Sequence, residues 1–263
     1  MRTALTIAGS DSIAGAGIQA DLKTFAALGV YGVSALTAVT AQNTRDVADI
    51  FALSPQMVRA QIDQIAHDVE IVAVKTGMLA TGDIVRTVAE TVGRFLQPNL
   101  VVDPVIAASG RSTRTLLAPE AVSILKARLL PIATVVTPNV PEAEALSGIH
   151  VDSMTSGREA AKRIAGMGAA AVVIKGGHLS GPDAIDLLFH EGTFFEIAAP
   201  RVELERIHGT GCTFASAIAA GLALGDDVPA AVHRAKRYIS GAIEHSFAIG
   251  RGARILNHFW EHT

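Results

Sequence analysis

The sequence contains almost no cysteine, since Cys212 is alone among 263 residues. A single cysteine cannot form a disulfide within the chain, and it cannot supply a cysteine-rich zinc site. Disulfide frameworks belong to oxidising compartments, so their exclusion favours a reducing one. We therefore expect a cytoplasmic protein.

An excess of positive charge and long apolar runs are lacking as well. The 22 Lys and Arg residues face 25 Asp and Glu residues, a formal net charge of −3, which argues against a nucleic-acid-binding surface. No stretch approaches the roughly 18 uninterrupted apolar residues that cross a bilayer. The N-terminal apolar stretch is too short for a secretory signal, because it ends at Gly9-Ser10-Asp11. We expect neither a nucleic-acid partner nor a membrane segment.

Several catalytic motifs are absent too. The chain has no Gly-Lys dipeptide and hence no Walker A loop, no Gly-x-Ser-x-Gly elbow and no His-Glu-x-x-His zinc motif. The glycine pairs Gly15/Gly17 and Gly209/Gly211 each lack the third glycine of a dinucleotide fingerprint. These absences argue against a P-loop NTPase, an α/β-hydrolase and a zinc hydrolase, and they leave only weak support for NAD binding.

What is present is a large apolar fraction, 49% against 18% charged residues, which can fill a sizeable core. Short β-branched runs alternate with longer segments of helical period, which predicts an α/β fold with a mainly parallel central sheet and helices on both faces. Strands are expected at residues 4–8, 33–39, 71–75, 100–103, 134–137 and 171–175, and helices at 18–26, 215–224, 228–242 and after residues 54 and 81. Shorter strands at 185–189, 193–197 and 202–204 predict an antiparallel edge. No linker interrupts the chain, so we expect one domain over residues 1–263.

The expected parallel strands are mostly followed by Gly, Asp, Asn, Pro or Lys, as in Asp103-Pro104 and Lys175-Gly176-Gly177. In open α/β sheets, ligands bind outside the carboxyl ends of the strands. The loops that follow the strands should therefore converge on one site.

A glycine-rich segment, His208–Thr213, precedes the helix expected at residues 215–224. Its glycines would let backbone N–H groups converge at a helix N-terminus and hold a phosphoryl group as it transfers. Cys212 in the first turn would have a lowered pKa and could act as a base. A glycine-rich turn with an inert, buried cysteine fits the same spacing.

Asn139 and Glu142 follow the strand expected at residues 134–137. Lying one turn apart, they would both face a metal-bound triphosphate, with the Glu142 carboxylate ordering Mg²⁺ through water. An Asn cap with Glu three residues later is also a frequent helix start. Lys175 ends another strand, where it could aim its charge at phosphates or simply be solvated.

Two polar residues stand out in the N-terminal half, Asp21 and Gln42. The Gln42 amide offers both a donor and an acceptor, which suits the edge of an aminopyrimidine ring better than the hydroxyls of a sugar. The alternatives are a solvated helix position for Asp21 and a loop cap for Gln42.

Eight segments, in order over nearly the whole chain, carry a resemblance to a known family. They are residues 4–12, 15–24, 40–44, 75–79, 102–105, 137–139, 175–179 and 208–213. Together they resemble the hydroxymethylpyrimidine/phosphomethylpyrimidine kinases of thiamine biosynthesis, which belong to the ribokinase-like superfamily. The resemblance implies a ribokinase-like fold and ATP-dependent phosphorylation of 4-amino-5-hydroxymethyl-2-methylpyrimidine, followed by a second transfer that gives the diphosphate.

On the substrate side, the resemblance implies that Gln42 hydrogen-bonds the pyrimidine. Gly9, Asp21 and Met78 would line the pocket. Cys212 would approach the acceptor hydroxyl. A homodimer is compatible with the resemblance, because relatives are often dimers.

On the nucleotide side, the resemblance places Asn139, Glu142 and Lys175 against ATP and Mg²⁺. The anion hole would be formed by Gly209, Thr210 and Gly211.

Four segments depart from the family pattern: Ile13-Ala14, the loop at 106–111, Leu204–Ile207, and Gly250–Gly252. The second and third leave substrate range and nucleotide binding more open than the reaction class. A pyridoxal or pyridoxamine kinase is the alternative within the class, and Gln42 favours the aminopyrimidine over it. A pyrimidine-binding protein without catalysis is a further alternative.

Overall fold

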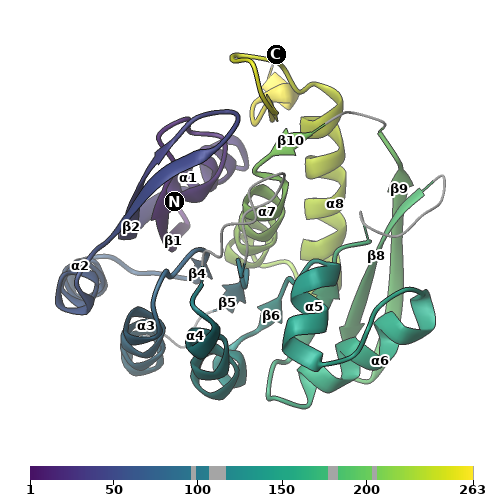
Figure 1. Ribbon diagram of the computed structural model, residues 1–263, viewed down its shortest axis with the longest axis horizontal. Coiled ribbons are helices and arrows are strands. Elements are labelled where there is room, and N and C mark those ends of the chain that lie inside the picture. The colour runs from purple at the N-terminus through teal and green to yellow at the C-terminus, as the bar shows by residue number, and fades with distance from the viewer. Residues whose placement is uncertain (96–98, 107–116, 177–182, 203–205, 263) are drawn as a thin grey trace.

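A nine-stranded sheet runs through the molecule in the order β3-β2-β1-β4-β5-β6-β7-β8-β9 (Figure 1). The computed structural model describes residues 1–95, 99–106, 117–176, 183–202 and 206–262. The strands are β1 (Thr3–Ser10), β2 (Tyr31–Gln42), β3 (Val47–Ala52), β4 (Ala73–Thr76), β5 (Asn99–Val102), β6 (Val135–Val136), β7 (Ala171–Ile174), β8 (Asp183–His190) and β9 (Thr193–Pro200). A separate pair joins β10 (Ile207–His208) to β11 (Arg254–Ile255).

The six central strands are parallel, and the strands at both edges are antiparallel. This confirms the mainly parallel sheet and the antiparallel strands near residues 185–197. β3 was not expected, because an edge strand buries little and therefore has a weak apolar alternation: Asp49 and Phe51 are both exposed. The third short strand is wrong at Val202, which lies beyond the end of β9, while residues 203 and 204 lie outside the described residues.

Helices cover both faces of the sheet (Figure 1). They are α1 (Gly17–Ala27), α2 (Pro55–Asp68), α3 (Gly82–Phe95), α4 (Pro119–Ile124), α5 (Val140–Ser147), α6 (Met154–Ala165), α7 (Thr210–Leu224) and α8 (Val228–Glu244), with short π and 3₁₀ turns at 125–129, 130–132 and 260–262. On one face, a hydrophobic cluster contains residues of helices α2, α3, α4, α5 and α6 together with strand residues such as Leu5 and Val74. A second joins α1, α7 and α8 with Ala4 and Val101, which point to the other face.

The central helix α7 is buried along most of its length, with small residues such as Ala215, Ala217 and Ala219 fully covered. Small side chains let a helix lie close to the strands beneath it, and α7 packs against β1, β4 and β5. Its first residues consequently lie at the carboxyl ends of those strands. Across the described ranges, no helix combines the length and the apolar character needed to cross a membrane.

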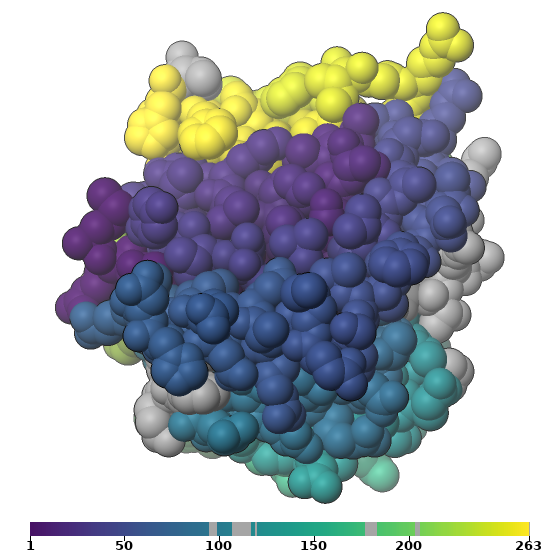
Figure 2. Space-filling view, turned by 90° about the vertical axis from the view of Figure 1, so that its left-hand side faces the viewer, coloured from purple at the N-terminus to yellow at the C-terminus, as the bar shows by residue number. Residues whose placement is uncertain are grey.

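The C-terminal segment, residues 246–262, folds back over the N-terminal loops, and Figure 2 shows its yellow atoms beside the purple ones. The N–H of Ala253 donates to the carbonyl of Thr44 at 2.8 Å. His258 is buried, and its Nε2 lies 3.1 Å from the Thr213 hydroxyl on α7. Burial, together with the charge of Lys23, lowers the pKa of His258 to about 4. His258 therefore stays neutral, and its Nε2 can accept a hydrogen bond from the Thr213 hydroxyl.

The free energy of unfolding should fall as the pH drops from 7 to 4. Unfolded His258, with an ordinary pKa of 6.5, binds a proton in this range that the folded protein does not bind until about pH 4. The contribution to the slope approaches about 1.4 kcal/mol per pH unit. Urea denaturation of wild type and His258→Gln across this range should show a shallower dependence in the variant. Equal slopes would contradict a neutral, buried His258.

Candidate active site

The candidate site lies where four parallel strands end beside the start of α7. The residues that directly follow β1, β4, β5 and β7 are Asp11, Gly77, Asp103 and Lys175. A β-carbon added to Gly211 would lie 3.2 Å from the Lys175 Nζ and 3.5 Å from the Asp103 Oδ2. The loops therefore converge as the sequence predicted, and they meet under the first turn of a helix.

The turn into α7 requires glycine. Gly209 has a left-handed backbone with φ of 87°, and a β-carbon there would lie 1.7 Å from the carbonyl oxygen of Gly15. The first turn of a helix has no intrahelical acceptor for its amides, and within the described residues no side chain caps α7. The amides of Thr210, Gly211 and Cys212 are thus left for an anion, and the helix dipole adds about half a positive charge.

Lys175 supplies a cation beside these amides. Its Nζ lies 3.0 Å from Asp103 Oδ1 and 4.0 Å from Glu142 Oε2, and 17% of its side chain is exposed. Burial by itself would lower the pKa of Lys175, but the charges of Asp103 and Glu142 raise it above the ordinary value. Lys175 is therefore a permanent positive charge held at the start of α7.

Asn139 and Glu142 form a capping box at the start of α5. The Asn139 side chain accepts the Glu142 N–H at 2.9 Å, and the Glu142 carboxylate accepts the Asn139 N–H at 2.9 Å. Burial raises the pKa of Glu142, although Lys175 acts in the opposite direction. The ordinary helix-start interpretation is correct for both residues, and the same geometry brings the Glu142 carboxylate toward the Lys175 ammonium.

The expected lowering of the Cys212 pKa is wrong. Burial raises the pKa of the thiol to about 11, and the carboxylates of Asp21 and Asp103 act in the same direction. The charge of Lys75 and a hydrogen bond from the Gly17 amide oppose the increase without outweighing it. A place in the first turn of a helix indicates a favourable dipole, but it does not reveal how far the thiol is removed from water.

Asp21 lies beneath the site as half of a buried ion pair. Both of its carboxylate oxygens lie within 2.9 Å of Lys75 Nζ, and both side chains have zero exposure. The hydroxyls of Thr6 and Ser216 donate to the same carboxylate at 2.6 and 2.7 Å. Asp21 therefore stabilises the residues beneath the site. Because its side chain is fully buried, it does not line a pocket as expected.

Gly9 and Met78 meet at the ends of β1 and β4. A β-carbon on Gly9 would lie 2.4 Å from the Met78 Cε, so the glycine lets the end of this methionine side chain lie directly against the strand. The Thr37 hydroxyl donates to the Met78 carbonyl at 2.6 Å and fixes the loop. Gly9 also contacts the start of α1, because a β-carbon on Gly17 would lie 2.4 Å from the Gly9 carbonyl oxygen.

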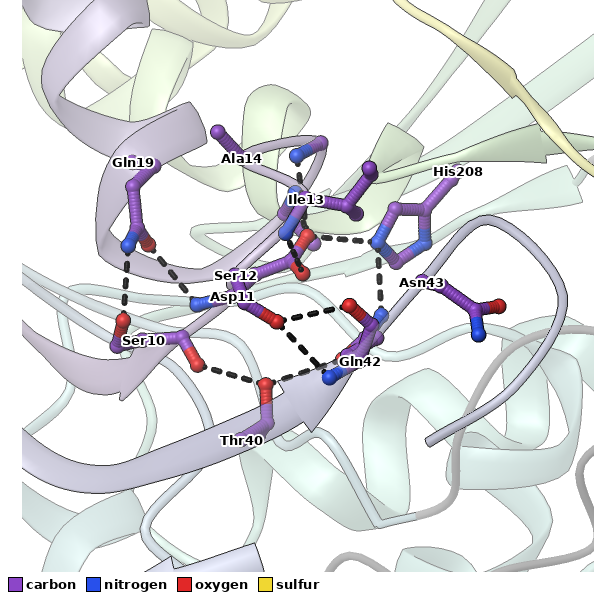
Figure 3. Close-up of polar contacts among 12 residues, drawn as sticks. Ser10, Asp11, Ser12, Ile13, Ala14, Gln19, Thr40, Gln42, Asn43 and His208 are labelled. Carbon is purple, nitrogen blue, oxygen red and sulfur yellow. Dashed lines mark hydrogen bonds and ion pairs between the residues drawn. The ribbon is translucent and has the colours of Figure 1, made fainter. Parts of the chain in front are cut away.

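Gln42 ends β2 on the other side of the site, and Figure 3 shows its surroundings. Its side-chain amide nitrogen lies 3.0 Å from His208 Nε2, and the same ring nitrogen lies 2.8 Å from Asp11 Oδ2. Burial by itself would raise the pKa of Asp11, but the hydrogen bond and charge of His208, with backbone amides, bring it below the ordinary value. Gln42 is thus connected through His208 to the start of α7.

The structure also places four ionisable residues here for which no role was predicted: Asp11, Lys75, Asp103 and His208. All four belong to the segments that carried the family resemblance. The available signal was an ionisable residue inside or directly after an apolar strand, where burial requires a partner. The departures at 107–111 and at 204–205, and residues 177–179 of another segment, lie outside the described residues.

Comparisons with known proteins agree with this geometry. The family model for phosphomethylpyrimidine kinase matches residues 11–257. The chain is 48% identical over 256 residues to a hydroxymethylpyrimidine/phosphomethylpyrimidine kinase of Streptomyces coelicolor, covering 97% of this chain and 94% of the relative. It is also 48% identical over 254 residues to a thiamine biosynthesis bifunctional protein of Geobacter sulfurreducens, covering 97% of this chain but 51% of that longer protein.

A solved structure gives the same picture of the fold. The ADP complex of Bacillus subtilis pyridoxal kinase superposes with a TM-score of 0.91 at 40% identity, covering 98% of this chain and 97% of that one. The ribokinase-like architecture implied by the resemblance is confirmed. With its site at the strand ends and a family match over most of its length, this chain belongs to the phosphomethylpyrimidine kinase family.

Proposed function

We propose that this phosphotransferase moves the γ-phosphate of ATP to the hydroxymethyl group of 4-amino-5-hydroxymethyl-2-methylpyrimidine, and a second phosphate to the resulting monophosphate. The observation that carries the proposal is the start of α7, where uncapped amides meet the Lys175 ammonium. The names of the Streptomyces and Geobacter relatives support the substrate and its place in thiamine biosynthesis. The Bacillus complex with ADP supports the nucleotide.

Phosphoryl transfer depends on positioning and on charge stabilisation more than on covalent chemistry by the protein. The amides of Gly209, Thr210 and Gly211, with that of Cys212 next to them, would hold the oxygens of the migrating phosphoryl group. Lys175, kept cationic by Asp103, would neutralise part of the phosphate charge. Asn139 would lie against the nucleotide at the start of α5.

Two carboxylates fit a Mg²⁺ ion, those of Asp103 and Glu142. Their nearest oxygens lie 3.0 and 4.0 Å from Lys175 Nζ. Among the described residues, no group of three or more Asp, Glu, His or Cys side chains could hold a metal alone. Mg²⁺ commonly takes one or two carboxylates and completes its shell with phosphates and water. Bound there, with Glu142 acting through water, the ion would offset the negative charge of the phosphates.

The pyrimidine would lie between the ends of β1 and β2, with Gln42 at its edge and Gly9 and Met78 against its face. The first acceptor is an alcohol, which must lose a proton, whereas the second is a phosphate ester already charged at neutral pH. Cys212 would take the proton in the first step alone. With a thiol pKa of about 11, only about one molecule in 10⁴ carries the thiolate at pH 7.

The alternative substrate is pyridoxal, and the specific observation in its favour is the close superposition on a pyridoxal kinase. The identity to the Streptomyces pyrimidine kinase is higher, at 48% against 40%. We retain from the sequence the proposal of a cytoplasmic enzyme, which rests on the single cysteine. A homodimer remains a proposal as well, and the exposed Val39 and Phe51, paired across β2 and β3, offer an apolar edge for it.

Incubation with ATP, Mg²⁺ and the pyrimidine alcohol should give the monophosphate and then the diphosphate, both detected by mass spectrometry. Pyridoxal is assayed in parallel, and kcat/KM for the pyrimidine should be the larger. A larger value for pyridoxal would replace the proposed substrate. Binding of the pyrimidine with no release of ADP would mean that the protein is a non-catalytic binder.

Cys212→Ala should slow the first transfer by about 100-fold, near the lower end of general-base contributions because little thiolate exists at neutral pH. The second transfer should change much less. The wild-type rate of the first step should also rise between pH 7 and 10, since the thiolate fraction grows below a pKa of about 11, and the variant should lose this rise. Single-turnover assays of each step provide the measurement. Equal losses in both steps would assign Cys212 to packing.

Gln42→Leu should weaken binding of the pyrimidine alcohol by about 1–3 kcal/mol, because a polar ring edge is left unpaired in a partly buried site. Isothermal titration calorimetry gives the affinity. Gln64→Leu on the exposed face of α2 is the matched control and should bind as wild type does. Unchanged affinity in Gln42→Leu would remove this residue from the binding site.

A further inference from the structure

We propose that Asp11 and His208 are positioning residues that orient the Gln42 amide so that its N–H₂ group faces a bare ring nitrogen of the substrate. The inference rests on the proposed function, because it deepens the role given to Gln42 at that same site. All hydrogen-bond partners of the Asp11 carboxylate are donors.

The Asp11 carboxylate lies almost completely buried at the end of β1. Its Oδ1 accepts the N–H of Ile13 at 3.0 Å, and its Oδ2 accepts the N–H groups of Gly15 and Ala16 at 3.0 and 2.8 Å. His208 Nε2 is the fourth partner, at 2.8 Å. An ionised carboxylate only accepts hydrogen bonds, so the proton in this contact must reside on His208 Nε2.

A proton on His208 Nε2 determines which end of the Gln42 amide can face it. The terminal nitrogen of Gln42 lies 3.0 Å from His208 Nε2, and its oxygen lies 3.3 Å from the Thr40 hydroxyl. The two ends of an amide have nearly the same shape, so the hydrogen-bond network decides between them. An N–H₂ group against the His208 N–H would set donor against donor. The oxygen of Gln42 therefore faces His208, and it shares the single Nε2 proton with Asp11 Oδ2 in a three-centre contact.

With the amide oxygen on His208, the Gln42 N–H₂ group turns toward Thr40. The Thr40 hydroxyl already donates to the Ser10 carbonyl at 2.9 Å, so its oxygen is free to accept one of the two amide protons. In this arrangement no donor faces a donor among His208, Gln42 and Thr40, whose contacts Figure 3 shows. The second N–H of Gln42 then remains as a directed donor for the substrate ring.

The backbone of Gln42 is held by the same loop. Its N–H donates to the Ser12 hydroxyl at 2.8 Å, and that hydroxyl donates to the Gln42 carbonyl at 2.8 Å. His208 in turn precedes Gly209, whose backbone contacts Gly15. The His208 imidazole thus connects the Gln42 amide, which would hydrogen-bond the substrate ring, to the backbone amides at the start of α7, which would hold the phosphoryl group.

The chemical consequence is selectivity for a heteroaromatic alcohol whose ring nitrogen is an unprotonated acceptor. A ring with C–H or N–H at that place would leave the Gln42 donor unpaired. The discriminating measurement is the ratio of kcat/KM for the pyrimidine alcohol to that for analogues in which each ring nitrogen in turn is replaced by C–H.

We expect wild type to favour the pyrimidine over one of these analogues by about tenfold or more, the effect of one lost hydrogen bond in a partly buried site. Gln42→Leu and His208→Phe should each reduce that ratio to near one. His208→Gln, whose amide can keep an N–H near the position of Nε2, should retain most of the ratio. The double variant Gln42→Leu/His208→Phe should show no further loss, because both changes act on one contact.

A purely structural role for His208 would lower activity on both substrates together and leave the ratio unchanged, which would overturn the proposal. His233→Phe on the exposed face of α8 is the matched control and should behave as wild type in rate and ratio.

A second measurement needs no variant. Nitrogen-15 NMR of histidine-labelled protein should find the proton on His208 Nε2 at neutral pH, and a bare Nε2 would overturn the proposal even if His208→Phe failed to fold. Absence of pyrimidine phosphorylation by wild type would contradict the proposed function instead, and the NMR result would then decide the role of His208 alone.

Discussion

The geometry of the site depends on one buried carboxylate, that of Asp11 at the end of the central strand β1. Removing a carboxylate from water is unfavourable unless its acceptor positions are filled, and here three amides and an imidazole fill them. The amides precede α1, and the imidazole precedes α7. The requirement to satisfy a single charged group therefore holds two helix N-termini in place over the same strand end.

Three lysines, each paired with a carboxylate, support the site. Lys75 pairs with Asp21 beneath the site, and Lys175 pairs with Asp103 under the first turn of α7. Lys236 on α8 pairs with Asp186 on β8, whose other oxygen accepts the N–H of Gly176, directly after Lys175. Buried pairs contribute little net stability, because desolvation offsets their attraction, but breaking one leaves an uncompensated charge. Such pairs therefore favour one arrangement of the loops over near alternatives.

The elements that the sequence predicted well are those whose burial pattern is local. Fully buried strands such as residues 171–174 appear as continuous apolar runs, and Ser54-Pro55 marks the start of α2 through capping chemistry. The edge strand β3 was missed because an exposed strand has little apolar alternation to reveal it. The Cys212 pKa was wrong for a related reason: the dipole of α7 follows from the sequence, whereas the depth of the thiol depends on loops far away in the chain.

The amino-acid sequence by itself determined the α/β class, the ligand-binding edge of the sheet and, through its ordered motifs, the kinase family. Only the tertiary structure decided that Asp21 lies under the site, that Glu142 both caps α5 and approaches Lys175, and that His208 joins Gln42 to Asp11. These contacts bridge up to 197 positions of sequence. Hydrogen bonds and ion pairs act over a few ångströms, so their partners are chosen by the packing of strands and helices and not by spacing along the chain.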